Sequence, residues 1–454
     1  MMQVSHEVPL SVLSKSEEFN DYDYCLLHLT YENKTYKEYY QNAIKKGRKV
    51  LLDNSLFELG DALTLEEVAQ GVRELQPTWV VVPDCLDNKN TTIDRFKEWV
   101  EQYSDLDVLT IGVVQGKTID ELIECYSFMS QYADKIAIPF DSAAFQEYEI
   151  DSSNKLEKWC AGRQKFIQQL VAEKKWNYYK PHHLLGCSLA VEFSNPLYTD
   201  LNIETIDTSN PVVAAIHQLR YNVDGLKVKP SVKLCDLIDY KLTEYEERLM
   251  LYNIQMFRYI CNRERKWVAF FSQTGSEIST IIKKTGKHPF AVITTNKDFI
   301  PSPANEKNIR EKFEFENIFI IDRNIEEIKY ESLLKNLNVS REDLITLHGY
   351  LRIIPASICK YYSIYNLHPG LITKYPILKG KDPQQKAFNL GLKESGVIIH
   401  KVVPEVDSGP VVIEERISIE NLTLEEVYEQ LHLLATNAWL DFFKQHTQGE
   451  RITC

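Results

Sequence analysis

The stretch WVVVPDC, residues 79–85, is a short apolar run that leads into a carboxylate. A continuous run of Val and other apolar residues is typical of a strand that is buried on both faces. Six further runs rich in Val, Ile and Leu end in polar residues and are each followed by a helical pattern: CLLHLTY (25–31), KVLLDNS (49–55), DVLTIGVVQG (107–116), KIAIPFD (135–141), HHLLGCS (182–188) and IETIDTSN (203–210). This alternation predicts βα units around a parallel sheet.

Seven or eight such units predict an α/β fold with a (β/α)₈ barrel of TIM type over residues 1–240, and GLKVKPSV (225–232) is the candidate for the eighth strand. Residues 236–264 carry apolar and aromatic side chains at helical spacing, so we expect a helix there, with 241–264 as the connection between domains. From KWVAFFSQTGSE onward, a second series of strands and helices predicts a Rossmann-like, doubly wound domain over residues 265–454.

Composition narrows the class of protein. A chain of 454 residues is too long for one ordinary core, and its net charge of −13 argues against a broadly basic surface for nucleic acid. Two short basic patches, AIKKGRK (43–49) and DGLKVKPSVK (224–233), are expected to be solvated surface. The sequence shows no secretory signal, no membrane span and no zinc spacing among its 9 Cys. We therefore expect a cytoplasmic enzyme (in the host cytoplasm if virus-encoded) with neither a membrane nor a metal partner.

Polar side chains follow the predicted strands of the first domain. In a (β/α)₈ barrel, functional residues collect at the C-terminal ends of the strands. Asp141 is interpreted as a helix cap. Paired carboxylates at such an edge could support double displacement at a sugar carbon, one as nucleophile and the other as proton donor or acceptor. The residues at these ends are Asp53, Asn54, Asp84, Gln115, Asp141, Asp207 and Asn210.

Five short segments, in this order, resemble the tRNA-guanine transglycosylase family: LLDNSLFEL (51–59), VVPDCLDN (81–88), IGVVQGKT (111–118), LLGCSLAVEF (184–193) and TIDTSNP (205–211). They are most similar to the compact viral-type members that insert 7-deazaguanines into DNA, because no Cys and His cluster follows the barrel. The resemblance implies that Asp207 is the nucleophile on C1′ and that Asp53 is the general acid/base. It also implies that the base is bound by Asp84, Gln115, Gly116 and Gly186.

In the second domain, Asn366 and His368 follow the short strand SIY, and Asp407 lies in a loop between two later strands. A carboxylate beside an imidazole raises its pKa and fixes its tautomer, and an Asn can donate to a developing oxyanion. These three groups would suit acyl transfer to an amine.

The segments LHGYLRIIP (347–355), NLHPGLITKYP (366–376) and GVIIHKVVPEVDSGPVV (396–412) resemble the folate-dependent formyltransferase family. The resemblance implies 10-formyltetrahydrofolate as co-substrate and a primary amine as acceptor. His368 would be the general acid/base, Asn366 would stabilise the tetrahedral intermediate, and Asp407 would orient His368. The pterin pocket would be lined by Leu347, Gly349, Tyr350, Leu351 and Ile353.

The second domain departs from that family's pattern in two places. Gly370 stands where the family has Ser, in HPG instead of HPS. In the loop SQTGSE (272–277), Ser276 and Glu277 occupy the helix start at which glycinamide ribonucleotide enzymes hold a phosphate. A carboxylate there would repel a phosphate and suit a cationic amine. Alternatively, Glu277 is an exposed residue of the first helical turn, favourable to the helix dipole.

The two resemblances meet in one substrate, because 7-aminomethyl-7-deazaguanine bears a primary amine. We hypothesise that the first domain exchanges guanine in DNA for a 7-deazaguanine. The second would formylate the amine, before or after insertion. Two alternatives stay open: the polymer is tRNA, or the chain formylates a nucleotide-linked amino sugar and the barrel is a binding module. Both families include dimers, so a homodimer is possible.

Overall fold

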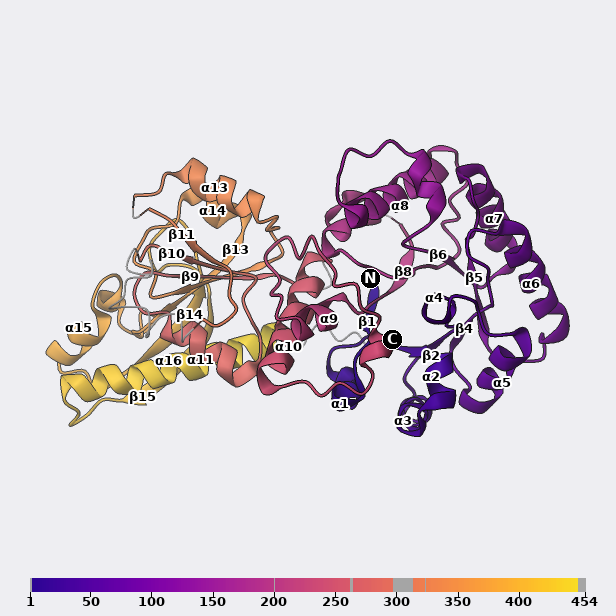
Figure 1. Ribbon diagram of the computed structural model, residues 1–454. Coiled ribbons are helices and arrows are strands. Elements are labelled where there is room, and N and C mark those ends of the chain that lie inside the picture. The colour runs from indigo at the N-terminus through magenta and orange to yellow at the C-terminus, as the bar shows by residue number, and fades with distance from the viewer. Residues whose placement is uncertain (1, 200, 262–263, 297–312, 323, 448–454) are drawn as a thin grey trace. The chain divides into compact units, whose positions relative to one another are not determined.

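The structure is a computed structural model that describes residues 2–199, 201–261, 264–296, 313–322 and 324–447. The chain divides into two compact units, Met1–Glu264 and Arg265–Cys454, and each is described by itself (Figure 1). Within the described ranges, no helix is both long and apolar enough to cross a membrane.

The first unit contains an eight-stranded sheet in the order β1-β8-β7-β6-β5-β4-β3-β2, and all neighbouring strands are parallel. The outermost strands β1 and β2 are linked by hydrogen bonds from Tyr24 N to Ser5 Oγ (3.0 Å) and from Asp21 N to Val4 O (3.0 Å), so the sheet is nearly closed. The strands are β1 (Gln3–His6), β2 (Asp23–Leu26), β3 (Val50–Asp53), β4 (Trp79–Val81), β5 (Leu109–Val113), β6 (Lys135–Ile138), β7 (His182–Leu184) and β8 (Ile203–Thr208).

The prediction of a strand at residues 225–232 was wrong, because the eighth strand is β1 at the start of the chain. Residues 226–232 form no strand in the structure. Pro230 has no backbone N–H to give to a sheet, and alternating Val and Lys alone do not make a buried strand. The first predicted strand is also shorter than expected, since α2 begins at Leu27.

In the first unit, helices such as α5, α6 and α7 lie on the outer side of the sheet, whereas the short α4 lies at the strand ends (Figure 1). The helices of this unit are α1 (Leu10–Leu13), α2 (Leu27–Glu32), α3 (Lys34–Lys45), α4 (Leu56–Leu59), α5 (Leu65–Leu75), α6 (Lys89–Gln102), α7 (Ile119–Tyr132), α8 (Lys155–Ala172), α9 (Asn210–Ile216) and α10 (Glu244–Ile260). Side-chain caps begin several of them, for example the capping box of Thr64 and Glu67 on α5.

The helix predicted over residues 236–264 begins later, at Glu244, where Thr243 and Glu246 form a second capping box. This helix, α10, packs within the first unit: Asn253 Nδ2 donates to Pro211 O (3.2 Å) and to Leu219 O (3.0 Å). It is therefore part of the first unit's core and not a separate connector.

The second unit has a seven-stranded sheet in the order β11-β10-β9-β12-β13-β14-β15. The first five are parallel, whereas β14 and β15 run antiparallel at one edge. Its strands are β9 (Trp267–Phe271), β10 (Ala291–Thr294), β11 (Ile318–Ile320), β12 (Leu344–His348), β13 (Ser363–His368), β14 (Glu394–Lys401) and β15 (Val411–Ser418). The described helices are α11 (Ser276–Thr285), α13 (Glu327–Asn336), α14 (Ala356–Tyr361), α15 (Pro383–Asn389) and α16 (Leu424–Thr447).

One face of α16 fills the core of the second unit. Trp439, Phe442 and Phe443 are buried with Trp267 of β9, and the rings of Trp267 and Phe443 meet edge to face with centroids 4.5 Å apart. The parallel strands with helices packed on them are Rossmann-like, as predicted, and the antiparallel edge adds two strands to that plan.

Candidate functional site

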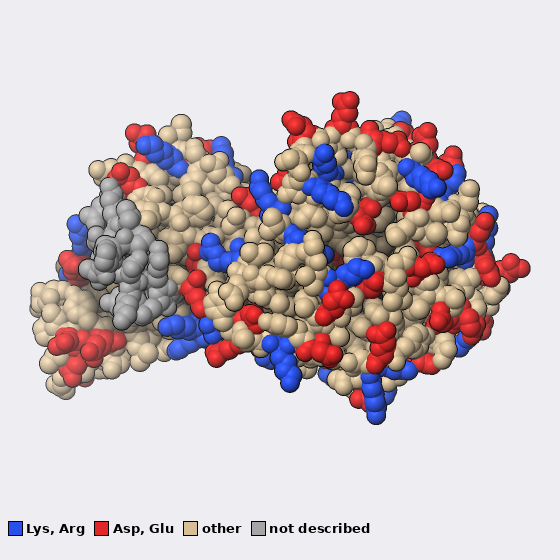
Figure 2. Space-filling model, in the orientation of Figure 1, with Lys and Arg blue, Asp and Glu red and all other residues tan. Residues whose placement is uncertain are grey.

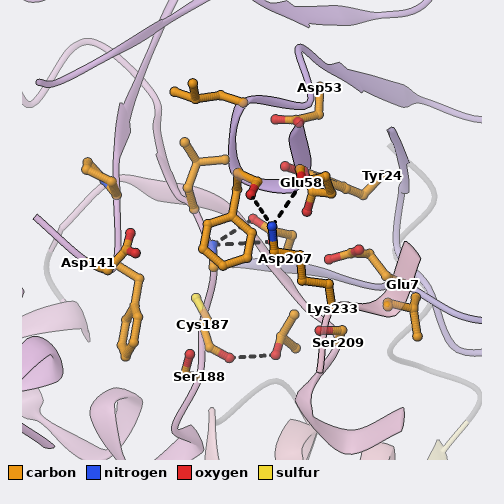
Figure 3. A pocket seen from close by; sticks show the side chains of 18 of the residues that line it. Glu7, Tyr24, Asp53, Glu58, Asp141, Cys187, Ser188, Asp207, Ser209 and Lys233 are labelled. Carbon is orange, nitrogen blue, oxygen red and sulfur yellow. Dashed lines mark hydrogen bonds between the residues drawn. The ribbon is translucent and has the colours of Figure 1, made fainter. Parts of the chain in front are cut away.

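A cavity of about 410 Å³ lies where the strands of the first sheet end (Figure 3). Five of the six base-binding and catalytic residues predicted for this unit line it, namely Asp53, Asp84, Gln115, Gly186 and Asp207. Gly116 is not one of the lining residues. A Cβ at Gly116 would lie 2.8 Å from Glu121 Cβ, so this glycine lets helix α7 approach the strand end.

Asp207 is held in one orientation by its neighbours. Gly186 N donates to its two carboxylate oxygens at 3.1 and 3.3 Å, and His183 Nε2 lies 3.1 Å from Oδ1. Gly186 has φ of 64°, a left-handed conformation that glycine adopts without strain. Burial lowers the pKa of His183, although Asp207 opposes this shift. A carboxylate held in one orientation is suited to nucleophilic attack.

Asp53 is buried at the end of β3, and Ser55 N donates to its Oδ2 at 2.7 Å. Burial, reinforced by the charge of Glu58, raises the pKa of Asp53 to about 8. A carboxyl group with this pKa holds a proton at neutral pH, which suits a general acid.

Asp84 and Gln115 are connected by a hydrogen bond. Gln115 Nε2 donates to Asp84 Oδ2 and Asn54 Nδ2 donates to Asp84 Oδ1, both at 2.8 Å. Burial raises the pKa of Asp84, and these two bonds oppose the shift. The network orients a polar edge in the cavity that can pair with the edge of a heterocycle.

The wall beside Gly186 is supported by a buried ion pair. Arg163 donates to both carboxylate oxygens of Glu192, at 2.8 and 2.7 Å, and to Leu185 O at 2.9 Å. Both side chains of the pair are fully buried. This contact fixes the backbone that carries Leu185 and Gly186.

Sequence reasoning missed several residues of this cavity. Glu7 follows β1, a strand that was not predicted, and Glu58 lies in the short helix α4. His183, beside Asp207, lies inside a strand and gave no signal of function. Asp141 lines the cavity, and the short helix after it has Ser142 at its N-cap without a side-chain cap, so the cap interpretation was wrong.

The two basic patches differ in their placement. In the first, Arg48 pairs with Asp23 (2.6 Å) and Lys46 with Glu17 (2.7 Å). In the second, Lys229 and Lys233 line the cavity, so the prediction of plain surface was wrong for these two. Figure 2 shows basic and acidic side chains mixed over the visible face, without a continuous basic surface.

In the second unit, the predicted catalytic residues come together at the end of β13. His368 Nδ1 lies 3.2 Å from Asp407 Oδ2, and Gly380 N donates to the same oxygen at 2.9 Å. His368 Nε2 lies 2.9 Å from Leu378 O. Both ring nitrogens therefore face acceptors, and only a doubly protonated ring donates to both. Burial lowers the pKa of His368, while Asp407 opposes this.

His400 completes this cluster and was missed, because it lies within the continuous buried run of strand β14. Its Nε2 is 3.5 Å from Asp407 Oδ1 and 3.5 Å from Asn366 Nδ2, so it joins Asn366 to the carboxylate. Burial would raise the pKa of Asp407, but the hydrogen bond from His400 and the charge of His368 lower it overall. Asp407 is therefore an ionised partner for two imidazoles.

The predicted pterin-binding segment follows β12. Leu347 and Tyr350 are buried, and Tyr350 bonds to Tyr330 through their hydroxyl groups. Leu351 and Ile353 are 62% and 76% exposed, so they offer apolar surface to a ligand. Gly349, with φ of 58°, makes the turn between these two sets.

Glu277 lies in the first turn of α11, as the alternative interpretation expected, but it is not exposed. Its side chain is 17% exposed, and Oε2 lies 3.1 Å from Nδ1 of the buried His348. Ser276, its neighbour, lies 3.1 Å from Thr274 through their hydroxyl oxygens. At the start of α11, Glu277 is thus a carboxylate paired with a buried imidazole.

Gly370, the other departure, is explained by the space around it. A Cβ at this position would lie 2.9 Å from Pro383 Cβ and 3.2 Å from His368 Nε2.

Over the ranges that the structure describes, no group of three or more His, Cys, Asp or Glu side chains could hold a metal ion.

Comparison with known proteins assigns the second unit. The family model described as formyl transferase matches residues 265–441. The chain is 31% identical over 128 residues to phosphoribosylglycinamide formyltransferase of Bacillus subtilis, covering 27% of this chain and 64% of that protein. It is 27% identical over 128 residues to methionyl-tRNA formyltransferase of Thermotoga neapolitana, covering 28% of this chain and 40% of that protein.

Among solved structures, phosphoribosylglycinamide formyltransferase from Anaplasma phagocytophilum aligns with a TM-score of 0.36 and 23% identity, covering 41% of this chain and 88% of that chain. Of the two curated relatives, the chain spans 64% of the length of the Bacillus subtilis protein and 40% of the length of the Thermotoga neapolitana protein. On the match of residues 265–441, the second unit of this chain is a formyltransferase domain.

Proposed function

We propose that the second unit transfers a formyl group from 10-formyltetrahydrofolate, the co-substrate of its family, to a primary amine. The observation that carries this proposal is the cluster at the end of β13, in which Asp407 contacts His368 and His400 while Asn366 contacts His400. The exposed apolar side chains of Leu351 and Ile353 suit the pterin of the folate.

The arrangement suits each step of the transfer. The amine nitrogen attacks the formyl carbon, and the oxyanion that develops accepts a hydrogen bond from Asn366. The bond from the formyl carbon to N10 of the folate then breaks, and N10 takes the proton held by His368. The amine gives up one proton in exchange, which restores the proton that His368 gave to N10.

For the first unit we propose that the nearly closed sheet is a (β/α)₈ barrel whose cavity performs base exchange on DNA. Asp207 attacks C1′ as the bond to guanine breaks, and Asp53 gives its proton to the departing base. The incoming 7-deazaguanine returns a proton to Asp53 and displaces Asp207. The raised pKa of Asp53, about 8, and the oriented Asp207 carboxylate support this division of roles.

A single substrate explains why both units occur in one chain. We propose that the barrel, residues 1–264, inserts 7-aminomethyl-7-deazaguanine and that residues 265–454 formylate its amine. Glu277 supports an unphosphorylated acceptor, because a carboxylate repels a phosphate by several kcal/mol at an effective dielectric of about 20. Lys229 and Lys233, which line the cavity, can contact the phosphates that flank the exchanged nucleotide.

Nucleoside mass spectrometry tests this proposal. DNA and tRNA are isolated from cells that express the chain and receive 7-aminomethyl-7-deazaguanine. The expected product is a deoxynucleoside heavier by one formyl group than the aminomethyl form. The aminomethyl base alone in DNA would support only the barrel, and modified tRNA would replace DNA as the polymer. Unchanged DNA and tRNA, with soluble protein and intact folate supply, would refute base exchange.

A further inference from the structure

Two carboxylates of the cavity have no role in the exchange chemistry. Glu7 lies directly after β1 and Glu58 lies in α4, and both side chains line the cavity with Asp53 and Asp207 (Figure 3). Across the described residues, no other side chain forms a hydrogen bond or ion pair with either carboxylate, and the hydrogen bond that Glu58 accepts comes from its own backbone. The cavity therefore holds two carboxyl groups that no basic side chain of the described residues pairs with.

The charges near Glu7 and Glu58 act on one another. Burial, then the charges of Glu58 and Asp207, raise the pKa of Glu7 well above its usual range. Burial also raises the pKa of Glu58 to about 7, and Asp207 adds to this shift. Ionising Glu7 and Glu58 therefore costs free energy in the empty cavity. A cation bound beside them would favour their ionised forms and offset that cost.

The two lysines of the rim do not supply that cation. Lys233 Nζ donates to the backbone carbonyls of Phe57 and Glu58, both at 2.9 Å, and lies 5.2 Å from the centre of the Phe57 ring. Lys229 and Lys233 lower the pKa of Glu58 by less than burial raises it. Room for a ligand cation remains beside the nucleophile Asp207.

We propose that Glu7 and Glu58 bind the ammonium group of the incoming aminomethyl base, so that base exchange precedes formylation and the second unit acts on the base in DNA. This inference rests on the proposed function. Formylation turns the ammonium into a neutral and longer amide, which cannot compensate these carboxylates. A free base that has already been formylated is therefore the poorer substrate of the barrel.

The geometry of DNA is compatible with this order. The 7-substituent of a deazaguanine occupies the position of guanine N7, which faces the major groove. After insertion the amine projects into that groove, where the second unit can reach it while the base stays paired. Formylation after insertion thus requires no second extrusion of the nucleotide.

A competition experiment tests the order of the two steps. The chain with His368→Ala, which lacks the formyl-transfer acid, receives duplex DNA and equal amounts of the aminomethyl base and its formylated form. Nucleoside mass spectrometry then measures both inserted bases. We expect a preference of roughly 10- to 100-fold for the aminomethyl base, the size that one charged contact gives. Added Glu7→Gln or Glu58→Gln should reduce this preference, whereas Glu244→Gln, at a 92% exposed side chain, should not.

A second arm uses the chain with Asp207→Asn, which cannot exchange bases, and DNA that already contains the aminomethyl base. Formylation of this DNA is the expected result. Equal insertion of both bases, an unchanged preference in both glutamine variants, or formylation of the free base alone would overturn the inference. These outcomes differ from failure of the proposed function, in which the His368→Ala chain exchanges no base at all, labelled guanine included, and both proposals fall.

Discussion

Replacing Asp407 by Asn isolates the charge on which the formyl-transfer site depends. Asp407 has φ of 48°, a conformation that Asn tolerates, and the Asn side-chain oxygen can still accept from Gly380 N. The change therefore removes one negative charge beside His368 and His400 while the loop keeps its shape.

The size of the effect follows from the contact distance. Two unit charges 3.2 Å apart attract by about 5 kcal/mol at an effective dielectric of ~20. If the imidazolium of His368 must persist into the transition state, losing roughly 3–5 kcal/mol lowers the rate by about 10²- to 10⁴-fold. The lower limit applies if His400 and solvent take over part of the stabilisation.

The pH profile gives a second reading of the same change. Asp407 raises the pKa of His368 against the larger effect of burial, which lowers it. Without the carboxylate, the hydrogen bond to Leu378 O still raises the pKa of His368, but the larger lowering effect of burial is opposed less. The limb of the rate profile that reports His368 should therefore move to lower pH. A general loss of folding would reduce the rate at every pH without moving the limb.

The assay is single-turnover formyl transfer to 7-aminomethyl-7-deazaguanine between pH 5 and 9, followed by mass spectrometry of the product. Asp382→Asn is the matched control, because Asp382 is an exposed aspartate with φ of 53°. A folded Asp407→Asn chain whose rate stays within threefold of the parent at every pH would refute the reasoning.

Four further outcomes are expected. Asp207→Asn should abolish the denaturant-stable complex between the chain and guanine-containing DNA on gels, and Asp224→Asn should leave it intact. Glu192→Gln should lower the free energy of unfolding in urea by about 3–5 kcal/mol, because it leaves a buried guanidinium without its charged partner. Gly370→Ala should reduce formyl transfer at least tenfold, since its Cβ would displace the ring of the catalytic imidazole, with near-parental circular dichroism. Asp53 has a pKa of about 8 in the folded state against a usual 3.8, so between these pH values the folded state keeps a proton that the unfolded state loses. The free energy of unfolding of the first unit should therefore fall between about pH 4 and 8, by up to ~1.4 kcal/mol per pH unit. The fall should be less steep in Asp53→Asn.

The sequence predicted the strands that are dense in Val, Ile and Leu, and with them the residues at strand ends. Asp53, Asp84 and Asp207 were found because a carboxylate after an apolar run stands out. Strand β1, QVSH, contains a single aliphatic residue, Val4, and its ladder of backbone hydrogen bonds is with β8, far away in the sequence. A local pattern could not reveal it, and Glu7 was lost with it.

In the second unit, too, a local sequence pattern revealed one site residue and not another. His368 was found because an adjacent Asn and Pro mark the end of a strand, and three ordered segments supported it. His400 lies inside β14 at the end of a run of consecutive buried residues, where a histidine looks like part of the core. Only its 3.5 Å approach to Asp407, a contact between two elements, assigns it to the site.

The pairing of β1 with β8 has a consequence for biosynthesis. Val4 lies opposite Ile206, so the ribosome must add about 200 residues between the two partners, which takes roughly 10–40 s at ordinary elongation rates. Throughout that interval the sheet is incomplete, because β8 has not been synthesised. Asp207, which lies on β8, is therefore not yet present beside Asp53. The nascent chain must therefore wait with an unpaired strand edge, which makes it a natural client for chaperones and makes its yield sensitive to the speed of translation.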